Sequence, residues 1–286
     1  MLDATINGGG LSELLLERVG PTGSLVGVDR DAEAIARLMP GLGHDGRVRL
    51  IVANFADLGD VGLALEPRSF DAAIFDLGLS SLQLDAPERG FSFRQDGPLD
   101  MRFDRSQTIT AADLLASLGE SELTELLRTW GQERWAAKIA RAVAEARKAR
   151  PLSTTREFAS LIERSIPRRY WPRAIHPATR AFQALRIAVN DELGALDQGL
   201  RSAIGLLRPR GRLAVISFHS LEDGMVKRLF AQESKDCICP PSQPICTCQH
   251  RASLRVLTRR PLLPGPRELA ANPRARSARL RICQAI

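Results

Sequence analysis

Long hydrophobic runs are absent from this chain of 286 residues, and cysteine and lysine are scarce. No apolar stretch approaches the roughly 20 residues of a membrane-spanning helix, and glycines and charges follow Met1 too soon for a secretory signal peptide. Five cysteines without a targeting segment indicate the reducing cytoplasm, where thiols are usually free or metal-bound. We therefore expect a cytoplasmic protein that does not bind a membrane.

The basic residues are almost all arginines, 36 beside four lysines, and charge is unevenly distributed along the chain. Residues 1–120 carry 10 basic and 19 acidic side chains, whereas residues 121–186 carry 14 and 6, and residues 249–286 carry 9 and 1. The net charges of these segments are therefore −9, +8 and +8. An acidic head with two basic blocks favours an enzyme that acts on a polyanion, and the alternative is a solvated helical face.

Short apolar segments alternate with helical ones over much of the chain. Buried strands separated by helices predict an α/β fold with a parallel sheet, which binds its ligand at the carboxyl ends of the strands. The predicted strands are residues 24–29, 48–52, 70–76 and 211–218, and the predicted helices between them include 31–39 and 188–207.

Residues 106–172 differ from their surroundings, because helical patterns follow one another there without a strand. The predicted helices are 111–118, 120–130, 133–147 and 155–166. We expect an inserted all-helical domain at 106–172 within an α/β domain formed by 1–105 and 173–286.

A glycine loop at residues 8–10 lies between an acid, Asp3, and a helix predicted over 12–19. Such a loop lets backbone amides at a helix N-terminus approach a ligand. Asp29 ends the next strand, 21 residues beyond the first glycine, where a carboxylate can accept the hydroxyls of a ribose. NAD enzymes and S-adenosylmethionine methyltransferases share this pair, and the alternative is a structural turn. Asp3 favours adenosylmethionine, because an acid attracts its ammonium group and repels a pyrophosphate.

Two further strand ends carry candidate pocket residues. Phe55 follows the third predicted strand and can pack beside an adenine, although by itself it is better explained as a core residue. Asp76 ends the next strand, where a methyl group would face its acceptor.

Long and unusual sequence runs give the chain its resemblance to a known family. Nearly the whole chain resembles the MraW/RsmH family of methyltransferases. The runs are DLGLSSLQLD at 76–85, ERGFSF at 88–93, DGPLDMR at 96–102, HPATR at 176–180, FQALRI at 182–187, SFHSLED at 217–223 and NPRARS at 272–277.

The resemblance implies a class I methyltransferase, with a Rossmann-like domain and an inserted helical substrate-recognition domain. Its implied reaction moves a methyl group from S-adenosyl-L-methionine to the N4 amine of one cytosine in the decoding region of small-subunit (16S) ribosomal RNA. The small ribosomal subunit is then the partner, and no obligate protein partner is implied. The alternatives are methylation of another nucleic acid and a non-catalytic ribosome-assembly factor with the same fold.

The resemblance also implies a set of cofactor-binding positions. Two of the loop positions differ from the family, which usually has histidine at Leu11 and glycine at Asn7. The family has a longer segment before the glycine loop, so we expect a truncated first strand here. The cofactor-binding positions are Gly9, Gly10, Leu11, Asp29, Phe55, Asp76 and Gln83.

The sequence does not assign the catalytic base. A cytosine amine needs a hydrogen-bond acceptor and a base that takes its proton. Asp76, Asp100 and His176 can each serve, but His176 precedes a proline and equally suits a loop or cap. A capping box beginning at Ser220 is favoured over direct roles for His219 or Asp223.

Four of the cysteines form a C-x-C…C-x-C pattern in a proline-rich segment. Cys237, Cys239, Cys246 and Cys248 are numerous enough for a tetrahedral zinc site, but C-x-C is tighter than the usual C-x-x-C spacing. Free thiols are therefore favoured and we assign no metal. Cys283 lies in the last apolar strand and is expected in the core.

Arginines alternate with aromatic residues at the end of the helical stretch. Arg168, Arg169 and Arg173 surround Tyr170 and Trp171, a mixture that suits phosphate pairing and base stacking on RNA. The alternative is that the aromatic rings pack against the other domain.

Overall fold

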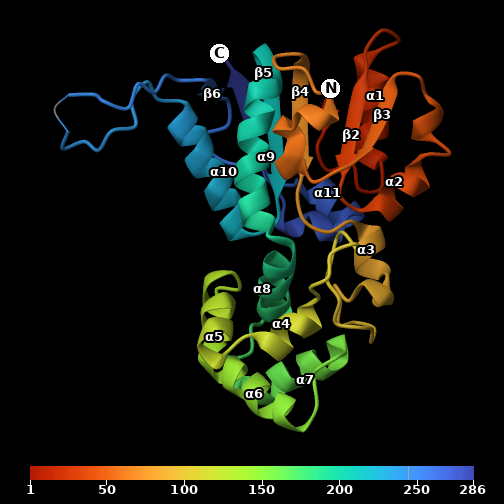
Figure 1. Cartoon of the computed structure of the whole chain (residues 1–286), viewed down its shortest axis with the longest axis vertical. Helices are drawn as coiled ribbons and strands as arrows, with labels where there is room; N and C mark the ends of the chain where they lie inside the picture. Colours follow the sequence, from red (N-terminus) through yellow and green to blue (C-terminus); the bar gives the residue numbers. More distant parts are fainter. Residues whose placement is uncertain (244) are drawn as a thin grey trace. The chain divides into compact units, whose positions relative to one another are not determined.

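The computed structural model describes residues 1–243 and 245–286, and it divides into two compact units (Figure 1). The first unit joins Met1–Gly78 to Leu193–Ile286, and the second comprises Leu79–Glu192. Each unit encloses hydrophobic cores of its own.

The first unit is built on a seven-stranded sheet with the order β3-β2-β1-β4-β5-β7-β6. The pairs from β3 to β5 are parallel, whereas β7 runs antiparallel to β5 and β6. The direction of strand order reverses between β1 and β4, and α/β sheets bind ligands at such a switch point. The predicted Rossmann-like α/β fold is confirmed. The strands are β1 (Leu2–Asp3), β2 (Leu25–Asp29), β3 (Val48–Val52), β4 (Phe70–Asp76), β5 (Leu207–Ser217), β6 (Leu254–Val256) and β7 (Arg279–Ala285).

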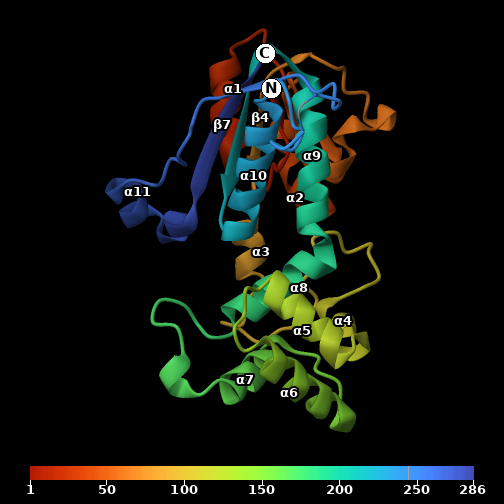
Figure 2. The same cartoon turned by 90° about the vertical axis from the view of Figure 1, so that its left-hand side faces the viewer.

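Helices cover both faces of this sheet. Leu25 of β2 packs in one core with Leu16 and Ile35, whereas Val28 of the same strand packs in another core with Leu196 and Val226. Residues three apart on a strand point to opposite faces, so α1 and α2 cover one face and α9 and α10 the other. Figure 2 shows α9 and α10 side by side along the sheet. The helices of this unit are α1 (Gly10–Val19), α2 (Ala32–Leu38), α9 (Glu192–Leu206), α10 (Ser220–Glu233) and α11 (Pro266–Ala271).

The second unit is helical, and residues 79–192, all of which the structure describes, contain no strand. Its core centres on buried side chains such as Ile139 and Phe158, and the ring of Phe158 lies 5.4 Å from that of Phe182. The residues 106–172 predicted as an insert lie within this unit. Its helices are α3 (Ser81–Asp85), α4 (Ala111–Ser117), α5 (Glu120–Thr129), α6 (Ala136–Ala149), α7 (Thr155–Ser165) and α8 (Thr179–Asn190).

Two boundaries differ from the sequence predictions. The single helix predicted over 188–207 is wrong, because Asp191 adopts φ 45° and separates α8 from α9. Asn190 fixes that break by accepting from the Phe103 N–H at 2.9 Å and donating to the Met101 carbonyl at 2.7 Å. The helix predicted at Ser220 is present, but its cap is His219, whose ring nitrogen accepts from the Glu222 N–H.

Candidate functional site

Three aspartates end three adjacent parallel strands of the first unit. Asp3 ends β1, Asp29 ends β2 and Asp76 ends β4, all on the carboxyl side of the switch point. Asp3 is fully buried and Asp29 is 9% exposed. Charged groups are seldom buried without partners, so these carboxyls indicate a specific binding role.

Asp3 connects the first strand to the first turn of α1. Its carboxylate accepts the Thr5 N–H at 3.2 Å and the Ser12 hydroxyl at 2.6 Å. Burial raises the pKa of Asp3 to about 6, although both hydrogen bonds act in the opposite direction. The two hydrogen bonds hold the side chain against the loop and the first turn of α1.

The glycine loop needs its left-handed backbone. Gly9 has φ 81°, and a Cβ there would lie 2.6 Å from the Leu38 side chain. Gly10 has open space at the same position, which leaves room beside the N-terminus of α1. Asn7 has φ 50°, and asparagine tolerates this region better than most residues. This accounts for asparagine where the family usually has glycine.

Asn7 also ties the loop to the neighbouring strand ends. Its backbone N–H donates to Asp29 at 2.9 Å, and its side-chain amide donates to the carbonyls of Thr5 at 2.9 Å and Asp76 at 3.3 Å. The other Asp29 oxygen accepts the Asp31 N–H at 2.9 Å. Burial raises the pKa of Asp29, while these backbone donors lower it. Each Asp29 oxygen keeps a second lone pair for a ligand hydroxyl.

Asp76 has a buried side-chain oxygen, Oδ1, that makes no hydrogen bond to the described residues. Its backbone N–H donates to the Thr5 hydroxyl at 2.6 Å, which fixes the end of β4 against the loop. Burial, and then the charges of Asp3 and Glu222, raise the pKa of Asp76 to about 6. Leaving a buried oxygen without a hydrogen bond costs free energy. We therefore expect this oxygen to accept a hydrogen bond from a ligand.

Glu222 is a member of this acidic set that the sequence reasoning missed. It lies in the first turn of α10, 2% exposed, and accepts the N–H groups of Phe218 at 2.8 Å and His219 at 3.2 Å. In the sequence Glu222 has the pattern of a helix-cap residue. Its charge raises the pKa of Asp76 because Glu222 follows β5, which pairs with β4.

The acids at the strand ends form an electronegative site. Mutual repulsion and burial keep the pKa values of these carboxyls high. A cationic ligand therefore stabilises the ionised carboxyls more than a neutral or anionic ligand does. A sulfonium or ammonium group satisfies this requirement, whereas a pyrophosphate is repelled. The geometry therefore suits adenosylmethionine better than NAD.

The remaining predicted cofactor residues have clear structural partners. Phe55 is half-buried, lies 5.6 Å edge-on from the ring of Phe75, and packs on Gly199 of α9, where a Cβ would lie 2.7 Å from its ring. Leu11 occupies the first turn of α1. Gln83 belongs to the second unit, 4% exposed, and forms a capping box with Ser80. Their cofactor roles stay predictions.

Two of the three candidate proton acceptors are already engaged. His176 lies 2.8 Å from the carboxylate of Glu163 through Nε2, and its Nδ1 accepts the Ala178 N–H at 3.2 Å. Asp100 forms an ion pair with Arg102 at 2.7 Å. Burial acts to raise the pKa of Asp100, but the hydrogen bonds and charge of Arg102 outweigh it and lower that pKa. Both therefore hold local structure in the second unit, whereas Asp76 has an oxygen without a partner among the described residues.

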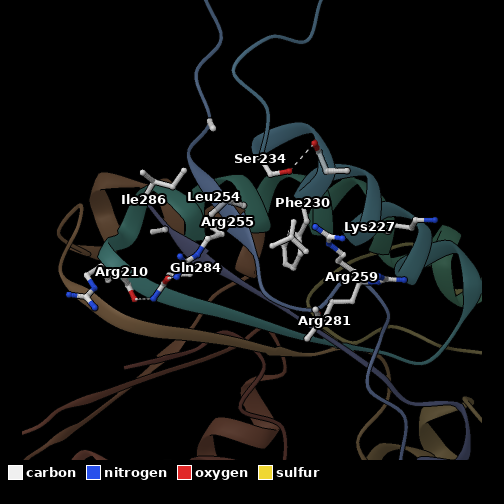
Figure 3. Close-up of a pocket in the computed structure, with 15 residues that line it drawn as sticks. Arg210, Lys227, Phe230, Ser234, Leu254, Arg255, Arg259, Arg281, Gln284 and Ile286 are labelled. Atoms are coloured by element: carbon white, nitrogen blue, oxygen red, sulfur yellow. Dashed lines mark hydrogen bonds between the residues drawn. The ribbon is translucent and has the colours of Figure 1, made fainter.

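A basic pocket of about 950 Å³ lies between α10, β6 and β7 in the first unit (Figure 3). Among the described residues its lining contains no acid, and Phe230 and Leu254 form part of its floor. The C-terminal basic block supplies three of the five cations, and Arg281 is neutralised by Asp223 at 2.6 Å. The cations are Arg210, Lys227, Arg255, Arg259 and Arg281.

The arginine and aromatic segment of the second unit lies at its surface. Arg168 and Arg169 stack over the rings of Trp171 and Tyr170, at 5.8 and 4.9 Å from the ring centres. Tyr170 is 51% exposed and also lies 5.2 Å from the ring of Trp135. Within the described residues, Arg168, Arg169 and Arg173 are exposed and form no ion pair. The aromatic rings therefore pack within their own unit, while the three arginines stay exposed.

Across the described part of the chain, every helix is too short or too polar to cross a membrane. The model of the MraW methylase family matches residues 1–286. The chain is 50% identical over 284 residues to the ribosomal RNA small subunit methyltransferase H of Trichlorobacter lovleyi, covering 99% of this chain and 91% of that protein. The proteins of the same name from Syntrophotalea carbinolica and Geobacter sulfurreducens are 50% and 48% identical, over 98% and 99% of this chain and 90% and 91% of theirs.

Proposed function

Because the chain belongs to the MraW methylase family, we propose that it methylates the N4 amine of a cytosine in the decoding region of 16S ribosomal RNA, using S-adenosyl-L-methionine. The relatives' shared name supports methylation of small-subunit ribosomal RNA. The structural support comes from Asp3, Asp29 and Asp76 at the ends of β1, β2 and β4, which we call the acidic switch point. These acids favour a cationic cofactor. The small ribosomal subunit in the cytoplasm is the proposed place of action.

Bound adenosylmethionine would supply an electrophilic methyl group on a sulfonium. Asp29 accepts hydrogen bonds from the ribose hydroxyls, because its two oxygens stay fixed by Asn7 and Asp31. The charges of Asp3 and Asp76 stabilise the cationic part of the cofactor. Gly9 and Gly10 give its methionine part access to the backbone beside α1.

Asp76 is the proposed acceptor for the cytosine amine. A hydrogen bond to its unpaired oxygen holds the amine lone pair toward the methyl group, and positioning of this kind contributes up to about 7–11 kcal/mol. The bound cofactor would supply the methyl carbon, with its sulfonium sulfur as the leaving group, and the amine that receives the methyl group would become cationic. The Asp76 carboxylate, which is mostly ionised at neutral pH, would then accept the surplus proton.

Two basic surfaces support a nucleic acid as the substrate. Arg168, Arg169 and Arg173 suit phosphates, and the exposed Tyr170 suits base stacking. The basic pocket beside α10 adds a second group of cations in the other unit. The target cytosine must leave its stack, since base pairing would shield its amine.

The proposal is tested by incubating the protein and labelled cofactor with small subunits from cells that lack the enzyme, followed by mapping of the modified base. We expect one N4-methylated cytosine in the decoding region. Asp76→Asn should lower kcat about 10²- to 10⁴-fold, whereas Asp71→Asn, at the exposed start of β4, should leave it unchanged. Methylation of another nucleic acid, or binding to subunits without any methylation, would support an alternative function instead.

A further inference from the structure

The segment between α10 and β6 projects from the sheet of the first unit as a long loop (Figure 1). It carries both C-x-C pairs, and the four sulfur atoms of Cys237, Cys239, Cys246 and Cys248 all lie within 4.8 Å of one another. Cys239 and Cys246 are seven positions apart, so the chain must fold back to bring the two pairs together.

Two of the sulfur–sulfur distances match those of a tetrahedral metal site. The Cys246 and Cys248 sulfurs are 3.6 Å apart, and those of Cys248 and Cys237 are 3.8 Å apart. Zinc binds thiolates at about 2.3 Å, which places two sulfurs of a tetrahedral site about 3.8 Å apart. A disulfide needs about 2.05 Å, and all four cysteines are free. The C-x-C spacing that favoured free thiols in the sequence is therefore compatible with a closed site.

Hydrogen bonds shape the loop around the sulfurs. The Ile238 N–H points to the Cys248 sulfur at 3.4 Å, a contact that stabilises a thiolate. The Gln243 amide donates to the Ile245 carbonyl at 3.0 Å and to the Thr247 hydroxyl at 2.8 Å. These hydrogen bonds stabilise the turn between the two C-x-C pairs. These few exposed hydrogen bonds orient the loop locally around the sulfurs.

His250 is excluded as a ligand because it holds the base of the loop. Its Nδ1 lies 2.9 Å from the Lys235 carbonyl, and its Nε2 lies 3.5 Å from Glu233 of α10. The donor set therefore consists of four sulfurs, which is typical of structural zinc and leaves no coordination position for catalysis.

The described part of the loop lacks a hydrophobic core that could hold this shape. Ile238 is 42% exposed and Ile245 is 73% exposed, so neither contributes much burial. Segments without a core are usually held by a metal or by disulfides, and metal binding then supplies the folding free energy.

We propose that Cys237, Cys239, Cys246 and Cys248 form a structural four-thiolate site for Zn²⁺ that orders the loop between α10 and β6. Zinc fits better than calcium or magnesium, which prefer oxygen ligands. The site is separate from the acidic switch point, and the inference does not depend on the proposed methyltransferase function.

The first test measures metal in the full chain, purified with reductant and without chelator. Elemental analysis should find about one zinc per chain, and Co²⁺ added to the metal-stripped protein should give the intense visible absorption of a tetrahedral thiolate site. Stoichiometric Zn²⁺ should abolish that absorption. Absence of both zinc and the cobalt signal would overturn the proposal, as would a mass that reveals disulfides among the four cysteines under reductant.

The second test uses a double variant, Cys239→Ser with Cys246→Ser, and a matched control, Cys283→Ala, which removes a buried thiol of β7 outside the cluster. The double variant should lose the metal, whereas the control should keep it. Tryptic cleavage after Lys235 and Arg251, which flank the cluster, should accelerate when zinc is removed and slow again when it is returned. Full metal retention by the double variant, or cleavage that is indifferent to zinc, contradicts the proposal.

Discussion

Asp29 has both oxygens fixed by backbone donors and still has lone pairs for a ribose. Asp29→Ala should therefore weaken adenosylmethionine binding by about 1–3 kcal/mol, the range of hydrogen bonds to a charged group. Calorimetric titration measures this change, and Glu33→Ala, an exposed acid on the nearby α2, is the control. Equal affinity in a folded Asp29→Ala protein would remove Asp29 from the cofactor site.

The raised pKa values of Asp3 and Asp76 predict how cofactor binding depends on pH. Both are about 6 in the unliganded protein because of burial and neighbouring acids. A bound cation favours the ionised carboxyls, so binding releases protons below this pH, and affinity should rise as the pH increases through about 6 and then level off. Calorimetry in buffers of different ionisation enthalpy counts the released protons.

Asp3→Asn should reduce both the proton release and the slope of affinity against pH, and the exposed Asp71→Asn should change neither. The free energy of unfolding of the unliganded protein should change with pH in the opposite direction to the cofactor affinity. Because the folded pKa values lie above the unfolded ones, stability is greatest below about pH 4 with respect to these groups and declines as they ionise toward pH 6. Affinity that falls with increasing pH would contradict the electronegative site.

Single residues differ in how far the sequence reveals them. Asp29 and Asp76 could be predicted as pocket residues because each directly ends an apolar strand, and such ends meet at one edge of a parallel sheet. Glu222 could not, because its influence on Asp76 depends on the pairing of β4 with β5, which are separated by more than a hundred residues. The unpaired oxygen of Asp76 is likewise a property of packing that no pattern encodes.

At the scale of elements, apolar periodicity predicted most helices and strands, since burial of one face determines them. It failed where a single backbone conformation decides the outcome. Asp191 in the left-handed region divides one apolar pattern into α8 and α9, and the cap of α10 is the imidazole of His219 rather than the hydroxyl next to it.

The segment that carries Arg168, Arg169 and Arg173 should bind phosphate, because these exposed side chains have no acidic partner in the described residues. Replacing all three with glutamine should weaken RNA binding and reduce the slope of log affinity against log salt by roughly 2, at about 0.7 for each contact to a single strand. Binding measured over a range of salt concentrations gives this slope.

The matched control removes three other cations of the same unit, Arg128, Arg141 and Lys148. Each pairs with a glutamate at 2.8 to 3.6 Å, so it is partly neutralised already. The control triple variant should therefore change the slope less than the first one. Equal slopes in the two variants would show that general charge, not the arginine and aromatic segment, governs binding.

At the scale of the whole molecule, the acids of the cofactor site and the cations that suit RNA lie in different places. Asp3 and Asp29 at the strand ends are buried in the first unit, whereas the exposed cations lie on the helical segment and beside α10. The sequence indicated this division through its acidic head and two basic blocks, because net charge can be counted without a fold. It could not indicate that Arg281 is neutralised by Asp223, since that pair forms only when β7 lies beside α10.

This difference in exposure predicts that salt weakens RNA binding much more than it weakens cofactor binding. Exposed phosphate contacts release counterions, so RNA affinity should fall by orders of magnitude when salt is raised from about 50 to about 200 mM. The buried carboxyls of the cofactor site are screened much less, and adenosylmethionine affinity should change by less than about threefold over the same range. Titrations of both ligands in the same buffers test this directly. A steep salt dependence for the cofactor would place its binding acids in exposed solvent, and a flat one for RNA would mean that stacking and shape, rather than the basic blocks, hold the substrate.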